Sequence, residues 1–508
     1  MGITSISYMA FVAGVLLIYY LLPIRFRWIA LLTGSIAYML LAGDMILILY
    51  PILSVLIAWI CTGRMNSENE SAKKLLLGIS LAGCLGVLIA LKYLNLGIYT
   101  YNAVFGRILT GFKPATVLHF PVPVGVSFYT MSLLGYIFDV YYGICKSEKN
   151  YFRLLLFTTY FPLMISGPIV RYEYMNSRFT SIGKFDYKNF TYGIQRIIWG
   201  FFKVLVISER LAVAVGTVYD DYESYSGVMI VLATICFSFQ LYTNFSGSMD
   251  IVIGISEAMG IELPENFRQP FFSETIQEFW QRWHITLGAW LKDYILYPVL
   301  RTEAFRKLQN KLKDKMNKKK AKQLTTFAAM AILWFAVGLW HGGSWKYIWG
   351  TGLLQCVYII ISELCSPFFK GFYEKHGIKA DAVIFRYLRK LRTFLLISVG
   401  FMFFNAGSLS DGFGMLGRIV TDFGAKTLTD GSVMNLGLEM KDWCITIVSL
   451  LILWGCSILQ TKESLRDRLA KKHILIRWAV LYMLLFYVII FGRYGPGFSA
   501  AEFIYQGF

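Results

Sequence analysis

The sequence predicts an all-α membrane protein that crosses the bilayer many times, and three observations lead to this fold class. Of its 508 residues, 56% are hydrophobic and only 16% are charged, whereas soluble domains usually carry about 25% charged residues. Apolar runs of about 20 residues, the length that crosses a bilayer, recur along the whole chain. Basic residues, which give a formal net charge of +18, gather between these runs, as in cytoplasmic loops.

Charge and cysteine usage exclude other classes. The positive residues lie between apolar runs and form no basic–aromatic module, so we expect no nucleic-acid binding, and we expect contacts with membrane lipid headgroups instead. The eight cysteines are scattered and include no C-x-x-C pair. This pattern is typical of small buried hydrophobic residues, and we expect neither a metal site nor a bound cofactor.

The N-terminal part predicts four spans with the N-terminus outside the cell. Basic residues follow the first and third apolar runs (Arg25, Arg27, Arg64, Lys73) and are absent after the second, which places the odd connections in the cytoplasm. The first run has no basic segment before it, so we expect a retained span and no cleaved signal peptide. The predicted spans are residues 3–22, 28–42, 45–61 and 75–93.

Residues 119–170 are apolar but interrupted by helix breakers. Such breaks at membrane depth are tolerated where protein or a water-filled cavity satisfies the backbone. Asp139 and Arg171 border this region and could form an ion pair, for which a structural role is favoured over catalysis. The breakers are Pro121, Pro123, Gly125, Pro162, Gly167 and Pro168.

Beyond two long apolar regions between residues 189 and 260, the pattern changes twice. Residues 272–293 repeat Phe279, Trp283, Leu287 and Trp290 at helical spacing, which predicts an amphipathic helix. Residues 301–322 form a loop with ten bases and two acids. Such a loop is strongly cytoplasmic; it could also attract an anionic thioester donor, but we weight its role in topology higher.

The remaining apolar runs test this orientation. Each connection that the alternation places in the cytoplasm is basic, and the one between residues 408 and 442 is mainly acidic. The alternation leaves the C-terminus outside and puts His341 toward the outer end of its span. The predicted crossings are residues 323–340, 346–363, 393–407, 443–459 and 478–491.

Two histidines are the candidate catalytic residues. The chain holds only five histidines, and His284 and His341 each follow a tryptophan within apolar sequence. A desolvated histidine is costly unless its ring nitrogens are satisfied, and ionisable groups in a membrane are functional candidates. The alternative is that each histidine merely forms a hydrogen bond to a neighbouring helix.

The segments FWQRWHITLGAWLKDY around His284 and LWHGGSW around His341 resemble the two signature segments of the membrane-bound O-acyltransferase (MBOAT) family. Within it, the chain most resembles bacterial polysaccharide O-acetyltransferases of the alginate acetylation type. The segment QLYTNFSGSMDIVIG is also similar, but Asn244 stands where the family usually has aspartate, leaving Asp250 as the acid. Hydrogen bonding by Asn244 remains open.

The resemblance implies a single membrane domain over residues 1–508, with roughly 11–13 membrane helices plus amphipathic and broken helices around a central tunnel. It divides into N-terminal helices (1–116), a catalytic core (117–365) and C-terminal helices (366–508). His341 would be the general base and His284 a second catalytic group that positions a substrate. The expected substrate-binding residues are Arg282, Trp283, Trp340, Gly342, Asn244 and Ser246.

The resemblance also implies a function at the bacterial cell membrane. An acyl group, expected to be acetyl, would move from cytoplasmic acetyl-CoA, another acyl-CoA or an acyl carrier protein to an extracytoplasmic cell-surface polysaccharide, with a separate extracytoplasmic acetyltransferase as partner. One alternative is D-alanyl transfer to teichoic acid: the long C-terminal extension argues against it, and the missing glycine-rich turn after LKDY leaves it open. A saccharide transporter is a second alternative, disfavoured because no repeated half is present.

Overall fold

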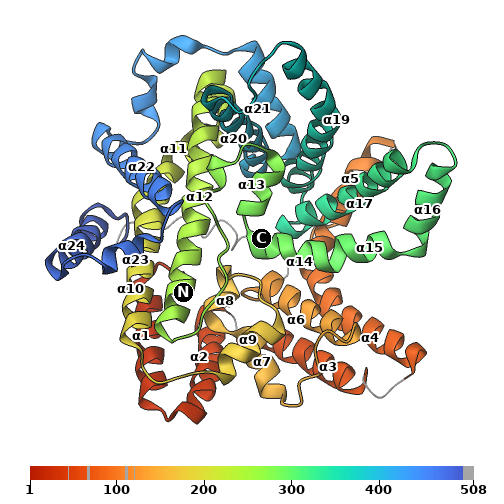
Figure 1. The fold of residues 1–508 in the computed structure, drawn as a ribbon, viewed down its shortest axis with the longest axis vertical. Coiled ribbons are helices and arrows are strands. Elements are labelled where there is room, and N and C mark those ends of the chain that lie inside the picture. Colours follow the sequence, from red (N-terminus) through yellow and green to blue (C-terminus); the bar gives the residue numbers. More distant parts are fainter. Residues whose placement is uncertain (44, 66–68, 109–111, 119–120, 496–508) are drawn as a thin grey trace. The chain divides into compact units, whose positions relative to one another are not determined.

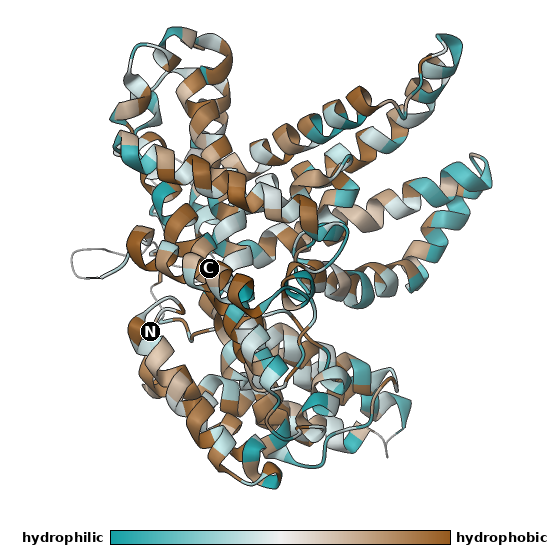
Figure 2. Ribbon diagram, turned by 60° about the vertical axis from the view of Figure 1, so that its left-hand side comes forward, coloured by the Kyte–Doolittle hydropathy of each residue, from teal (hydrophilic) through white to brown (hydrophobic). Residues whose placement is uncertain are grey.

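The computed structural model describes residues 1–508 except 44, 66–68, 109–111, 119–120 and 496–508. The described residues form helices and a single isolated β-bridge, with no strand among them (Figure 1). Hydrophobic residues predominate along many of the helices, and many of the hydrophilic residues lie toward helix ends and turns (Figure 2). Among these residues, eight helices are long and apolar enough to cross a membrane: Ile24–Ala42, Met45–Met65, Glu70–Gly106, Gly227–Ala258, Lys318–His341, Trp345–Lys375, Met440–Gln460 and Ile474–Phe491.

The predicted class, an all-α polytopic membrane protein, is therefore confirmed. Helix α1 (Ile6–Leu21) is apolar but shorter than these eight, and α20 (Val383–Asn405) carries several bases in its first half. The expected number of 11–13 membrane helices therefore requires such shorter or more basic helices to cross as well. The central tunnel stays a prediction.

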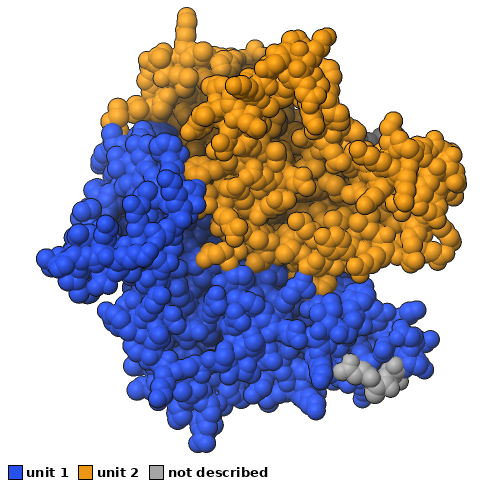
Figure 3. Space-filling view, in the orientation of Figure 1, with its two compact units in different colours: residues 1–210, 240–264, 441–508 blue, residues 211–239, 265–440 orange. Residues whose placement is uncertain are grey.

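The chain forms two compact units, each built from segments distant in sequence (Figure 3). Unit 1 comprises residues 1–210, 240–264 and 441–508, and unit 2 comprises residues 211–239 and 265–440. Helix α12 (Gly227–Ala258) contributes residues to each. The three-part division expected from the sequence was based on the family resemblance, whereas these two units are defined by contacts within the structure. The units therefore do not test that division, and it stays a prediction.

The first part of unit 1 follows the predicted spans. It contains α2 (Arg27–Ala42), α3 (Leu49–Met65) and α4 (Glu70–Leu88), and α4 continues through a π-helical turn, η3 (Ile89–Tyr93), into α5 (Leu94–Ile108). The chain then forms α6 (Val126–Tyr141), α7 (Tyr151–Thr159), α8 (Phe161–Ser166) and α9 (Tyr172–Thr180). Gly125 precedes α6, Pro162 lies in the first turn of α8, and Gly167 and Pro168 lie between α8 and α9. Residues 119 and 120 of this region lie outside the described residues.

Gly125 shows why one of these breaks needs glycine. Its φ is +72°, and an added Cβ would lie 2.2 Å from the carbonyl oxygen of Met164. Only glycine fits both the backbone angle and the close approach.

The predicted ion pair also forms, because Arg171 Nη1 lies 3.5 Å from Asp139 Oδ1.

Unit 1 also contains α10 (Tyr187–Phe201) and a π-helical segment, η4 (Phe202–Ser208), beside the second half of α12. A Cβ added to Gly247 would lie 2.9 Å from the carbonyl oxygen of Gly200. At this contact the absence of a side chain on Gly247 lets the two helices approach closely. The unit ends with α22 (Met440–Gln460), α23 (Leu465–Ala470) and α24 (Ile474–Phe491).

Unit 2 contains the stretch with both candidate histidines. Its helices are α11 (Glu209–Tyr219), α13 (Ile276–Arg282), α14 (Ile285–Leu291), α15 (Tyr297–Arg301), α16 (Glu303–Lys313), α17 (Lys318–His341), α18 (Trp345–Tyr347), α19 (Leu354–Lys375), α20 and α21 (Leu409–Thr421). The basic segment 301–322 is mostly helical, which corrects the prediction of a loop. Thr302 caps α16 by accepting from Phe305 N, and Asn317 caps α17 by accepting from Lys320 N.

Candidate active site

The predicted amphipathic helix over residues 272–293 is wrong, because the chain breaks at His284. Helix α13 ends at Arg282, and α14 begins at Ile285. His284 has φ 46° and ψ 54°, a left-handed conformation that is uncommon outside glycine. Strained backbone of this kind persists only where surrounding contacts enforce it, and it is frequent at functional sites.

The residues before α13 enforce this break by hydrogen bonding to the backbone around His284. Arg268 N donates to Arg282 O at 2.9 Å, and Ile285 N donates to Asn266 O at 3.0 Å. An isolated antiparallel bridge joins Phe267 to Trp283. A helix through His284 would have to forfeit these contacts.

The side chain of Asn266 also sets the orientation of the His284 ring. Its Oδ1 accepts hydrogen bonds from Thr286 N at 3.1 Å and from Thr286 Oγ1 at 3.0 Å, and it lies 3.2 Å from His284 Nδ1. Because Thr286 N can only donate, the Asn266 atom at this position is the carbonyl oxygen. An oxygen only accepts, so we assign the proton of neutral His284 to Nδ1 and leave Nε2 as the hydrogen-bond acceptor.

His284 is 3% exposed and lies outside each of the eight candidate spans. Burial lowers its pKa from 6.5 to about 3, because desolvation disfavours the charged ring. The imidazole is therefore neutral at physiological pH. A group with so low a pKa is a weak general base and a suitable hydrogen-bond acceptor.

His341 is the last residue of α17 and is also 3% exposed. Its ring lies edge-on to Phe404, with centroids 5.5 Å apart, and 4.9 Å from the ring of Trp340. Trp340 in turn contacts His284, with centroids 5.5 Å apart. One indole therefore touches both candidate catalytic rings.

Close packing in unit 2 fixes the end of α17 that carries His341. A Cβ added to Gly338 would lie 2.5 Å from Ile348 Cα, in a π-helical segment η8 (Ile348–Leu353). Across the same contact, a Cβ on Gly352 would lie 2.7 Å from the carbonyl oxygen of Trp334. Gly342 caps α17 in an extended conformation, its N–H donating to Leu339 O at 3.2 Å.

A model of the membrane-bound O-acyltransferase family matches residues 146–406, a range that contains both histidines and half of the chain. The chain belongs to this family. It is 30% identical over 423 residues to a probable alginate O-acetylase AlgI of Azotobacter vinelandii, covering 81% of this chain and 76% of that protein. Membership of the MBOAT family makes the protein an O-acyltransferase.

Two further relatives show how broadly this MBOAT chain is similar. A peptidoglycan O-acetyltransferase of Helicobacter pylori is 27% identical over 382 residues, which cover 70% of this chain and 66% of the relative. A teichoic acid D-alanyltransferase of Bacillus subtilis is 27% identical over 290 residues, which cover 56% of this chain and 68% of the relative. The alginate-type resemblance therefore extends over more of the chain.

The remaining predicted site residues of this MBOAT protein have varied surroundings. Trp283 is buried, with its ring centroid 5.1 Å from Phe401 and 5.4 Å from Phe279, and these contacts account for it as a packing residue. Arg282 pairs with Glu278 at 2.6 Å. The substrate role expected of either residue stays a prediction.

Asn244 and Ser246 lie on the part of α12 that belongs to unit 1, whereas the other six predicted site residues belong to unit 2. Both are buried. Lys203 Nζ lies 3.3 Å from Ser246 Oγ and 2.6 Å from Asp250 Oδ2. In unit 1, Ser246 is thus part of a buried charged cluster.

Sequence reasoning missed the partners of two site segments. Asn266 lies outside the signature segment around His284, and its hydrogen bonds to His284 and Thr286 are non-local, with no spacing in the sequence that indicates them. Glu274, just before α13, pairs with Arg389 at 2.7 Å and with Arg386 at 3.4 Å. Although partial burial raises the pKa of Glu274, these two guanidinium groups hold it below its ordinary value. This cluster anchors the start of α13 to α20.

Proposed function

We propose that this enzyme transfers an acyl group, acetyl in the first instance, from a cytoplasmic thioester to a hydroxyl of an extracytoplasmic cell-surface polysaccharide. The observation that carries the proposal is the arrangement in unit 2, where the Trp340 indole touches both the His284 and the His341 rings. The names of the relatives support the choice of group and acceptor, since two of them are O-acetyl-transferring proteins of alginate and peptidoglycan.

In the proposed reaction, His341 is the general base. It takes the proton of the acceptor hydroxyl while the hydroxyl oxygen attacks the thioester carbonyl carbon. The C–O bond forms, the C–S bond breaks, and the leaving thiolate then receives the proton from His341. The carbonyl end of a helix favours positive charge, so the position of His341 at the C-terminus of α17 suits an imidazolium formed during the reaction.

His284 has a different role in this proposal. With its proton held on Nδ1 by Asn266, the neutral ring presents Nε2 as an acceptor that orients a donor group of one substrate. Gly342, beside His341, leaves room for a substrate to approach the backbone. No acyl-enzyme is needed, because the two substrates react directly.

Orientation and partners form a further part of the proposal. The positive-inside pattern puts both termini outside the cell and the basic segment 301–322, with α16, in the cytoplasm. Acyl-CoA or an acyl carrier protein would then approach from the cytoplasm, and the acceptor from the other side. The acceptor hydroxyl then belongs either to the polysaccharide itself or to a separate extracytoplasmic acetyltransferase, which would receive the acetyl group and pass it to the polymer.

D-alanyl transfer to teichoic acid remains the second candidate. The similarity to a D-alanyltransferase over 290 residues favours it, and only the donor and acceptor differ from the first proposal. Comparing acetyl-CoA with a D-alanyl carrier protein as donor separates the two.

The test measures consumption of radiolabelled acetyl-CoA by the purified full chain in detergent, for wild type, His341→Ala and His376→Ala. General-base catalysis contributes about 10²- to 10⁴-fold, so we expect His341→Ala to lose activity by that factor. His376 is an exposed histidine at the end of α19, and its replacement should change nothing. Full activity of a well-folded His341→Ala variant would refute the mechanism, and an inactive wild type would favour the carrier-protein donor.

A further inference from the structure

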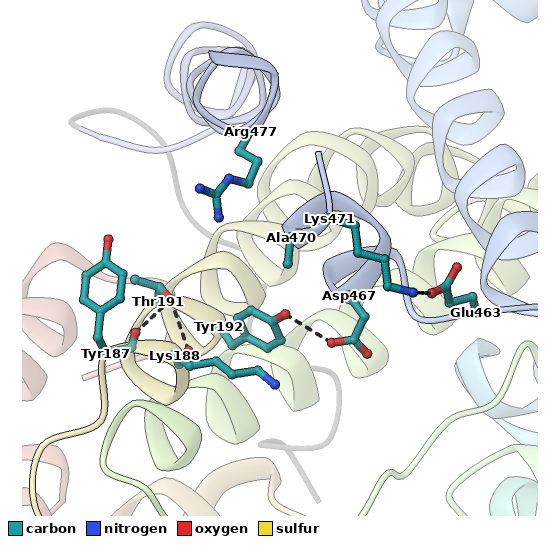
Figure 4. A pocket seen from close by; sticks show the side chains of 9 residues that line it. All are labelled: Tyr187, Lys188, Thr191, Tyr192, Glu463, Asp467, Ala470, Lys471 and Arg477. Carbon is teal, nitrogen blue, oxygen red and sulfur yellow. Dashed lines mark hydrogen bonds and ion pairs between the residues drawn. The ribbon is translucent and has the colours of Figure 1, made fainter. Parts of the chain in front are cut away.

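Unit 1 contains a surface pocket whose lining includes none of the candidate site residues. Its volume is about 590 Å³, and it is lined by side chains of α10, α23, the turns on either side of α23 and the start of α24. Figure 4 shows Tyr187, Lys188 and Tyr192 on α10 facing Asp467 on α23 and Arg477 on α24. Both polar and aromatic groups therefore reach the same space.

The charges in this pocket are unevenly satisfied. Lys471 pairs with Glu463, and Asp467 accepts a hydrogen bond from Tyr192 Oη at 3.1 Å. Among the described residues, Lys188 and Arg477 have no carboxylate partner; the Lys188 ammonium lies 5.2 Å from the centroid of the Tyr192 ring. The buried Nε of Arg477 has no hydrogen-bond partner among those residues.

Two cations on different helices that face one space favour an anion between them. Arginine binds a phosphate through several N–H donors, and lysine adds a point charge. A buried N–H without a partner is destabilising, and a phosphate oxygen on Arg477 would supply that partner. Figure 4 shows the Arg477 side chain pointing from α24 toward the α10 residues, with no dashed line to any residue drawn.

The helix that carries Arg477 identifies the rest of the ligand. Only 6% of α24 is buried within the structure, although it is among the most apolar of the candidate spans. Directly after Arg477, an aromatic stripe runs along the helix: Trp478 stacks on Tyr482 at 5.3 Å, and Tyr482 stacks on Phe486 at 6.2 Å. All three are about half exposed, so they offer acyl chains a continuous apolar surface.

We propose that this pocket binds the phosphate headgroup of an anionic phospholipid between Lys188 and Arg477, with the acyl chains along the exposed face of α24. Basic pockets between membrane helices on the cytoplasmic side are typical sites for such headgroups. The connection before α24 is one of those that the charge pattern places in the cytoplasm. Tyr187, Tyr192 and Asp467, which also line the pocket, would contact the part of the headgroup attached to the phosphate.

Native mass spectrometry of the full-length protein, titrated with phosphatidylglycerol or phosphatidylethanolamine in detergent, tests this proposal. Wild type should retain phosphatidylglycerol in preference to phosphatidylethanolamine. Each cation near a membrane surface contributes enough for about a fivefold change in affinity, so Arg477→Gln and Lys188→Gln should each weaken retention by about that factor. Arg477→Lys, which keeps the charge, should lose less.

The matched control is Arg468→Gln, which removes an exposed positive charge from α23 that does not line the pocket. It should leave lipid retention unchanged. An equal loss of lipid retention in Arg468→Gln would show that any positive charge in this region attracts the lipid. That result would refute a specific binding site in the pocket. Equal retention of both lipids would overturn its preference for an anionic headgroup. Displacement of the lipid by millimolar inorganic phosphate would identify a soluble phosphate ligand in place of a phospholipid. Lys188 and Arg477 lie on different helices. If one of the two glutamine variants misfolds, lipid retention by the other variant still tests the site.

Discussion

Replacing Asn266 by alanine tests whether its amide sets the tautomer of His284. The change removes the acceptor 3.2 Å from His284 Nδ1, together with both hydrogen bonds from Thr286. One hydrogen bond contributes about 0.5–1.5 kcal/mol net, and 1.36 kcal/mol corresponds to a tenfold change in rate. If only this bond holds the proton on Nδ1, kcat should fall about two- to twelvefold.

Two further measurements separate this tautomer effect from a loss of structure. Thr286→Val removes the Thr286 Oγ1 bond to Asn266 and leaves the His284 contact in place, so it should lower stability slightly without the same fall in kcat. ¹⁵N NMR of labelled histidine should show protonated Nδ1 in wild type and a mixture of tautomers in Asn266→Ala. A kcat unchanged within twofold in Asn266→Ala, or an equal loss in Thr286→Val, would refute the reasoning.

Two predictions concern stability. Because the pKa of His284 is about 3 in the folded protein and ordinarily 6.5, the unfolded chain binds the extra proton; stability should be full above about pH 6.5 and fall as the pH drops toward 3. Thermal unfolding in detergent should show this slope for wild type, and His284→Gln should reduce it; equal slopes would contradict the assignment. Lys203→Met removes the partner of one oxygen of the largely buried Asp250 carboxylate, whose other oxygen keeps its pair with Arg196, and should cost about 1–3 kcal/mol. Lys307→Met breaks an exposed pair with Glu303 and should lower the free energy of unfolding by less than about 1 kcal/mol. A similar decrease in both variants would show that the Lys203–Asp250 pair stabilises the protein no more than an exposed pair does.

Local patterns predicted the long apolar helices and the location of one catalytic candidate. Apolar runs bounded by basic residues located α2, α3 and α17, because their length and composition depend on the bilayer and not on distant contacts. The alternation of apolar runs and basic connections placed His341 toward the end of its span, and α17 does end there. The caps Thr302 and Asn317, each a residue type that favours a helix N-terminus, could have revealed that the basic segment is helical.

Non-local contacts explain what the sequence could not predict. The aromatic spacing of Phe279 and Trp283 is helical, yet the helix breaks beside it because Asn266 supplies hydrogen bonds from 18 residues upstream. Asp250 was identified as the acid of its segment, but the bases that pair with it are Arg196 on α10 and Lys203 on η4. With 49 lysines and arginines in the chain, spacing alone could not select these two.

The geometry around Trp340 argues for dividing the proposed chemistry between the two histidines. Its indole touches both rings, so the two imidazoles border one aromatic group and can face different atoms of one reacting pair. His284 is held by a strained backbone and a fixed tautomer, and its low pKa disfavours uptake of a proton. His341 ends a helix, where positive charge is favoured. In the proposed mechanism we therefore assign proton removal to His341 and substrate orientation to His284, the two histidines whose rings contact the same tryptophan.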